Sequence, residues 1–122
     1  MRVADTSFLY ALFSETDEFH HRAVEAVKQP RTILIPPEIF SETMALIQYR
    51  QGFRAAVRAG NWLRGESIFE VRPGGESPSE ESWRIFRSSK GRLSYPDSVV
   101  LAWCKALKAD PLAFDEAVAE GV

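Results

Sequence analysis

Short apolar runs alternate with longer segments of helical periodicity along the whole chain. Antiparallel strands can be joined by tight turns, whereas parallel strands need a crossover connection, which is usually a helix. The alternation therefore predicts an α/β domain in which a central, mainly parallel sheet is flanked by helices. The predicted strands are 1–4, 31–36, 67–72 and 111–114, and the predicted helices are 6–13, 16–29, 37–51, 53–65, 79–90 and 96–109.

Proline, glycine and serine mark several of the predicted boundaries. Pro37 can be the first residue of one helix, and Gly52 follows the last residue of that helix. Ser77 and Glu80 have the spacing of a capping box, with Pro78 between them at a first helical position. We therefore expect the following helix to begin there.

The composition is that of one folded domain, residues 1–122. Hydrophobic residues make up 45% of the chain and charged residues 26%, as in globular proteins. No run approaches the roughly 18 apolar residues of a membrane-spanning helix, and the N-terminus shows no apolar export leader. We therefore expect a cytoplasmic location and no membrane partner. Cys104, the only cysteine, excludes an internal disulfide and a cysteine zinc site, and we expect it in the core.

Three aspartates lie where predicted strands end or predicted helices begin. Asp5 follows the first strand and Asp115 follows the fourth, and the carboxyl ends of parallel strands lie at one edge of a sheet. Asp97 lies in the first turn of the last predicted helix, which we expect at the same edge. A carboxylate such as Asp5 in an otherwise apolar run costs several kcal/mol unless something compensates it. Thr6 or Ser7 can cap the helix that follows.

Glu42 is a fourth acid that needs an explanation. It lies about 7–8 Å along the axis of helix 37–51 at 1.5 Å per residue. It shares a helix face with Ile39, Leu46 and Tyr49, so we expect it to point into an otherwise apolar stripe.

Each acid also has a structural interpretation when it is taken alone. Asp5 could cap a helix, Asp97 could be a first-turn acid, Asp115 could form a turn, and Glu42 could pair with an arginine. Together, four carboxylates at one edge would repel one another and take up protons unless cations were supplied. Mg²⁺ and Mn²⁺ prefer oxygen ligands, and such an ion can activate water and shield a phosphate. This chemistry is phosphodiester hydrolysis. The hydroxyl groups beside Asp5 could hold a metal-bound water.

Basic residues could guide a nucleic acid toward these acids, although the net charge of -2 gives no evidence for binding through bulk charge. Arg50, Arg54 and Arg58 are spaced by four, and they form a basic stripe if the helix persists through Gly52. A solvated helix face is the simpler interpretation of this stripe. Arg92, just upstream of Asp97, is better placed to contact a substrate or to pair with the acids.

Four segments, "VADTSFLYALF", "PPEIFSETMALI", "LSYPDSVVLAW" and "LAFDEAV", resemble the PIN domain, and most closely the small stand-alone ribonuclease toxins of the VapC type. The resemblance implies a three-layer sandwich with a sheet of four strands, or five. It also implies that Mg²⁺ or Mn²⁺ is bound by four catalytic acids and positions the water that cuts RNA. The implied partners are an RNA substrate, a small antitoxin whose C-terminal segment covers the site, and a second copy of the chain. The implied metal ligands are Asp5, Glu42, Asp97 and Asp115.

The sequence departs from the family pattern at two places. Ala113 stands where such domains often carry Thr or Ser, so a hydrogen bond that supports the site is expected to be missing. The chain stops at Val122, where the family usually adds one more strand. Glu116 could replace an extra acid that some members have nearby, or it could be a solvated surface residue.

Two other classes of function remain open at this stage. A non-catalytic PIN-like module could use the same acids to hold a metal ion, RNA or a basic peptide. A metal-dependent phosphatase of another α/β family has less support, because Ser7 occupies the place of the second acid in the usual Asp-x-Asp pattern.

Overall fold

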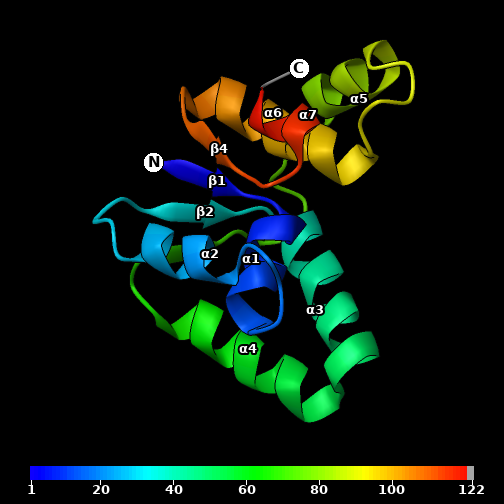
Figure 1. Ribbon diagram of the computed structural model, residues 1–122. Coiled ribbons are helices and arrows are strands. Elements are labelled where there is room, and N and C mark those ends of the chain that lie inside the picture. Colours follow the sequence, from blue (N-terminus) through cyan, green and yellow to red (C-terminus); the bar gives the residue numbers. More distant parts are fainter. Residues whose placement is uncertain (121–122) are drawn as a thin grey trace.

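The four predicted strands form a parallel sheet in the computed structural model, which describes residues 1–120 (Figure 1). Across the sheet the order is β3-β2-β1-β4, and every neighbouring pair is parallel, which confirms the predicted α/β class. The described residues form four strands, and the fifth strand that the resemblance allowed falls outside them. The strands are β1 (Arg2–Ala4), β2 (Ile33–Ile35), β3 (Phe69–Val71) and β4 (Asp110–Leu112).

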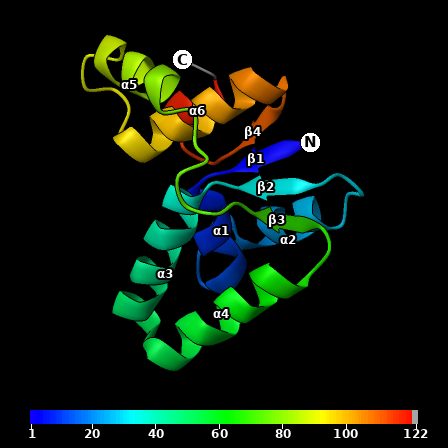
Figure 2. The same cartoon turned by 180° about the vertical axis from the view of Figure 1, so that it is seen from behind.

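Helices cover the sheet in two groups. Figures 1 and 2 show α1 to α4 on one side of the molecule and α5 to α7 on the other, with the strands between them. The arrangement is the predicted three-layer sandwich. The helices are α1 (Thr6–Phe13), α2 (His20–Val27), α3 (Pro37–Gln51), α4 (Phe53–Gly65), α5 (Ser79–Ser88), α6 (Tyr95–Leu107) and α7 (Glu116–Ala119).

The core lies against the two central strands, β1 and β2. Every residue of both strands is buried, which is why β2 is a continuous apolar run and β1 departs from one only at Arg2. Helices α1 and α6 supply much of the packing from the two sides. Their fully buried side chains include Phe8, Leu9, Val99 and Val100.

The start of α2 shows the largest difference from a predicted helix boundary, whereas the predicted break between α3 and α4 at Gly52 is confirmed. The helix predicted from residue 16 begins only at His20, because the Asp17 carboxylate accepts the backbone N–H of Phe19 at 2.8 Å and holds a turn there. Gly52 has a φ of 96° and separates α3 from α4. Its backbone conformation is one that L side chains rarely adopt, so the two helices change direction at this residue.

The predicted capping box at Ser77 is wrong. Helix α5 has no side-chain cap, because the Ser77 hydroxyl is used elsewhere: it donates to Glu38 at 2.6 Å and accepts from the Trp103 indole at 3.2 Å. The same Ser-x-x-acid spacing occurs at Ser94 and Asp97, and there the reciprocal hydrogen bonds of a capping box are present. The capping box is therefore found at the start of α6 and not at the start of α5.

Arg2 is buried in β1 and ties the strand to the end of α2. Only 4% of the residue is exposed. Its guanidinium donates to the carbonyl oxygens of Ala26 at 2.8 Å, Gln29 at 3.3 Å and Arg31 at 2.7 Å. These acceptors lie at and after the C-terminus of the helix, where backbone carbonyls lack partners and a cation is favourable.

Cys104 is buried on α6, as predicted, and burial raises the pKa of its thiol to about 12. It is therefore a packing residue rather than a nucleophile. Within residues 1–120, no helix has both the length and the apolar character needed to cross a membrane.

Candidate active site

Asp5 lies at the carboxyl end of β1 and caps the N-terminus of α1. It is 2% exposed, and its Oδ1 accepts hydrogen bonds from the backbone N–H of Phe8 at 2.9 Å and the Ser7 hydroxyl at 2.8 Å. Burial is the main cause that raises the pKa of Asp5 to about 6; repulsion from Asp97 and Asp115 contributes in the same direction, and the hydrogen bonds from Phe8 and Ser7 oppose the shift. The charged form of Asp5 is therefore costly.

Asp97 and Asp115 are brought toward Asp5 by the ends of α6 and β4. Asp97 completes the capping box of α6: its Oδ2 accepts from the Ser94 N–H at 3.1 Å, and its own N–H donates to the Ser94 hydroxyl at 3.2 Å. Asp115 caps α7 by accepting from the N–H groups of Ala117 and Val118. Because both carboxylates raise the pKa of Asp5, the three acids share one electrostatic environment at the carboxyl edge of the sheet.

Ser7 connects the segment that ends β1 at Asp5 with the segment that leads from β4 to Asp115. Its hydroxyl donates to Asp5 and accepts from the backbone N–H of Phe114 at 2.9 Å. Phe114 is itself held by stacking on Phe19 at a centroid distance of 4.6 Å. Ser7 therefore fixes the direction in which the chain enters Asp115.

Glu42 does not point into an apolar stripe, so that expectation is wrong. The buried face of α3 is formed by Ile39, Thr43 and Ile47, and Glu42 is exposed beside it. The Thr6 hydroxyl donates to Glu42 Oε1. Since Thr6 directly follows Asp5, this contact places the fourth acid near the others without burying it.

In the described part of the chain, the hydrogen bonds of the four acids use only one carboxylate oxygen of each residue. In each of the four acids a single carboxylate oxygen makes the hydrogen bonds described above, while within residues 1–120 the other oxygen has no such partner. The interpretation of Asp5 as a helix cap is confirmed, and so is the position of Asp97 in the first turn of a helix. Asp115, interpreted as a turn residue, caps α7.

The four acids have the donor chemistry that a divalent cation requires, but their side chains are not arranged as a metal site. Among the described residues, no group of three or more His, Cys, Asp or Glu side chains is arranged so that it could hold a metal ion. Carboxylate oxygens are nevertheless the ligands that Mg²⁺ and Mn²⁺ prefer. A cation at the edge would also offset the burial and repulsion that disfavour the charged form of Asp5.

The remaining candidate residues are Glu116 and the arginines of α3 and α4. Glu116 is exposed in the first turn of α7, next to the capping aspartate. The basic stripe required a helix that persists through Gly52. This condition is not met, because α3 ends before Gly52 and Arg54 lies on α4. Arg50 lies over the Tyr10 ring, 5.0 Å from its centroid.

Sequence reasoning missed two residues that support the site. The first is Ser94, which forms a capping box with Asp97. The Ser-x-x-acid spacing of these two residues is a signal that could have identified it. The second is Phe114, whose stacking on Phe19 follows from no local pattern, because the two residues belong to distant segments. Ala113 precedes it and is half-buried.

The fold and the position of the acids define a class of protein: a parallel α/β domain with acidic residues at the carboxyl edge of its sheet. The sequence matches the PIN domain over residues 2–120, and the chain belongs to the PIN domain family.

Two solved structures are similar to this chain. Mycobacterium tuberculosis VapC20, a Sarcin-Ricin loop cleaving toxin, has a TM-score of 0.84 and 24% identity, over 98% of this chain and 94% of that one. A chain of a toxin-antitoxin complex from Klebsiella pneumoniae has a TM-score of 0.68 and 22% identity, over 100% of this chain and 95% of that one. At these identities the similarity shows the fold. A search of curated proteins finds no significant match.

Proposed function

We propose that this protein is a Mg²⁺- or Mn²⁺-dependent endoribonuclease, the toxin of a toxin-antitoxin pair. The observation that carries the proposal is the shared edge of Asp5, Asp97 and Asp115, with Glu42 held nearby through Thr6. Membership of the PIN domain family and the likeness to a toxin that cleaves the Sarcin-Ricin loop support it.

The chain's own residues would prepare the site for hydrolysis. Asp5, Asp97, Asp115 and Glu42 would hold the metal through the carboxylate oxygens that capping leaves available. When bound, a divalent ion supplies an activated water and shields the charge of the scissile phosphate. Ser7 and the Phe8 amide fix the orientation of the Asp5 carboxylate, so that little reorganisation is needed when the ion and the RNA bind.

Metal removal tests the proposed function. Purified protein should cut single-stranded RNA when Mg²⁺ or Mn²⁺ is present, lose cleavage in excess EDTA, and regain it when either metal is restored. Gel analysis of end-labelled RNA measures the cleavage. Activity that persists in EDTA after dialysis would exclude the metal-dependent mechanism, and no cleavage of several RNAs with either metal would exclude the nuclease.

Ser7→Ala should lower the cleavage rate by about tenfold and the free energy of unfolding by about 1–2 kcal/mol, because it removes one hydrogen bond to Asp5 and leaves the Phe114 N–H without its acceptor. Initial cleavage rates and urea denaturation measure the two effects. Ser79→Ala is a matched control at an exposed position and should change stability by less than about 0.5 kcal/mol. Equal behaviour of the two variants would show that Ser7 does not position the acid.

An antitoxin is the protein partner in this proposal. Helices α1, α2 and α4 enclose an apolar groove of about 370 Å³, which suits the apolar face of a partner helix. The structural likeness to a chain of a toxin-antitoxin complex supports this assignment. The groove is lined by Leu12, Phe13, Val24, Val27, Lys28 and Trp62.

We also propose a homodimer and a cytoplasmic location. Tyr49 and Phe53, on either side of the turn between α3 and α4, are 88% and 68% exposed, and large exposed aromatic side chains are typical of interfaces. The cytoplasmic location follows from an RNA substrate. Sedimentation of the purified protein measures the oligomeric state.

A non-catalytic PIN-like module is the second candidate, because all three aspartates serve as helix caps and no finished metal centre is present within residues 1–120. It predicts binding of metal or RNA without turnover. The cleavage assay with restored metal separates the two candidates.

A further inference from the structure

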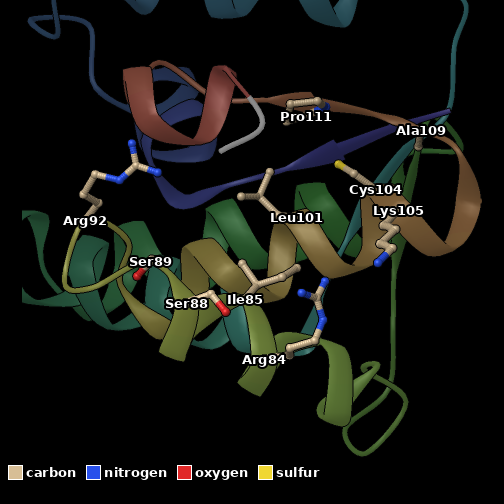
Figure 3. Close-up of a pocket in the computed structure, with 10 residues that line it drawn as sticks. All are labelled: Arg84, Ile85, Ser88, Ser89, Arg92, Leu101, Cys104, Lys105, Ala109 and Pro111. Carbon is tan, nitrogen blue, oxygen red and sulfur yellow. The ribbon is translucent and has the colours of Figure 1, made fainter.

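A cavity of about 530 Å³ lies between α5, α6 and the beginning of β4, outside the site described above (Figure 3). Its apolar lining includes Ile85 of α5, Leu101 of α6 and Pro111 of β4, and its polar groups include Ser88 and Ser89. The volume is within the range of small-ligand sites.

The charged residues that line the cavity are all basic. Figure 3 shows Arg92 at one end and Arg84 and Lys105 at the other. Glu81, which does not line the cavity, pairs with both Arg84 and Lys105 and holds them in place. Within residues 1–120, the Arg92 side chain has no ion-pair partner, so its charge is available to a ligand.

One face of α6 leads from Asp97 at the acidic edge to residues that line the cavity. Residues spaced by four lie on the same face of a helix, so Asp97, Leu101 and Lys105 follow one another along α6. At 1.5 Å per residue, the last two are about 6 Å and 12 Å along the axis from Asp97. The lining residues of this face therefore begin about 6 Å along the helix from Asp97, a separation that one nucleotide of an RNA chain can span.

The sequence around the cavity concentrates positive charge. Residues 84–92, "RIFRSSKGR", contain four basic residues and no acidic residue, in a protein with a net charge of -2. This segment leads to the helix that carries Asp97. Phosphates are the anions that recur at a regular spacing in a chain, and Arg side chains can both contact phosphate and stack on bases.

We propose that this cavity binds a nucleotide of the RNA substrate next to the cleaved bond. Its base lies against Ile85, Leu101 and Pro111, and the flanking phosphates contact Arg92 at one end and Arg84 with Lys105 at the other. This proposal rests on the proposed function, because it takes RNA as the ligand. It assigns to the cavity a part in selecting the RNA sequence.

The test measures binding separately from cleavage. A single-stranded hexaribonucleotide is titrated into isotope-labelled wild-type protein in EDTA, and backbone amide shifts are followed by NMR. We expect shifts at Ser89, Leu101, Lys105 and Ala109. A hexaglutamate peptide, titrated in parallel, should leave these amides unchanged.

A pair of charge-matched variants tests the contribution of Arg92. Arg92→Gln should weaken binding of the hexamer about five- to tenfold, as expected for one charge-assisted contact. It should also lower the slope of log Kd against log salt by about 0.7, the value for one phosphate on a single strand. Arg87→Gln removes the same charge from an exposed position of α5 outside the cavity and should change neither quantity.

The possible results separate this inference from the proposed function. If RNA is cleaved with metal but the cavity amides do not shift, or if Arg87→Gln and Arg92→Gln weaken binding equally, the nucleotide site is overturned and the ribonuclease stands. If the cavity amides shift but no RNA is cut, RNA binding in the cavity is supported, whereas the ribonuclease and the position next to a cleaved bond are overturned. Shifts caused by hexaglutamate and not by RNA would overturn the inference in favour of an acidic protein segment.

Discussion

Asp5→Asn should reduce RNA cleavage by about a thousandfold, which corresponds to about 4 kcal/mol of transition-state stabilisation, while it leaves the fold intact. The amide keeps an oxygen that can accept the hydrogen bonds from Phe8 and Ser7, and Asn is as good a helix cap as Asp. It lacks the negative charge that a divalent ion requires. Cleavage rates and circular dichroism measure the two effects.

The same substitution should stabilise the metal-free protein above pH 6. The pKa of Asp5 is raised from 3.8 to about 6, mainly by burial, so the folded protein keeps a proton that the unfolded chain has released. The contribution of Asp5 to stability is therefore complete below about pH 4 and is lost as the pH rises to about 6. A shift of two units corresponds to roughly 3 kcal/mol, and replacement of a charge-assisted hydrogen bond reduces the gain.

Urea denaturation in EDTA at pH 4, 6 and 8 measures this gain. Asp5→Asn should be more stable than the wild type at pH 8, and the difference should disappear toward pH 4. A variant that is less stable than the wild type at pH 8 would show that the carboxylate acts mainly as a structural cap. A stable variant with wild-type cleavage would exclude Asp5 from the catalytic site.

Arg2→Met should lower the free energy of unfolding by about 3 kcal/mol, because it leaves three backbone carbonyls near the end of α2 without their charged donor. Methionine retains much of the length of the buried side chain, so the change reports on the lost hydrogen bonds more than on a cavity. Urea denaturation at 25 °C measures the difference.

Arg31→Met is the control for Arg2. Arg31 forms an ion pair with Asp110 at 3.0 Å, but both side chains are largely exposed, so its loss should cost no more than about 1 kcal/mol. Similar losses for the two variants would show that the buried guanidinium contributes no more than a surface charge.

The class of fold was predictable because it depends on a pattern that runs through the whole chain. Short apolar runs separated by helical segments permit few arrangements other than a parallel sheet. The positions at which helices begin were harder to predict, as Ser77 and Ser94 show. Ser77 and Ser94 have the same local spacing to an acid, and only the tertiary contacts of Ser77 with Glu38 and Trp103 decide which of them caps a helix.

The candidate site could be predicted to the level of the edge on which the acids lie, but not to their contacts. Asp5 and Asp115 were placed correctly because each follows a strand. The exposure of Glu42 was not predictable from periodicity, since its helix buries the face of Thr43 rather than that of Leu46. The caps made by Asp97 and Asp115 could not be predicted in detail either, because the sequence does not show which backbone N–H groups each carboxylate accepts.

Direct titration of Mn²⁺, followed by electron paramagnetic resonance of the free ion, tests the central claim that these acids hold a catalytic metal. The wild-type protein should bind Mn²⁺ and be stabilised by it, while Asp5→Asn and Asp97→Asn should lose most of this affinity and the cleavage with it. Ser79→Ala, which removes an exposed polar group on α5, should bind as the wild type does. Mn²⁺ binding of equal affinity in the wild type and both aspartate variants would contradict the claim.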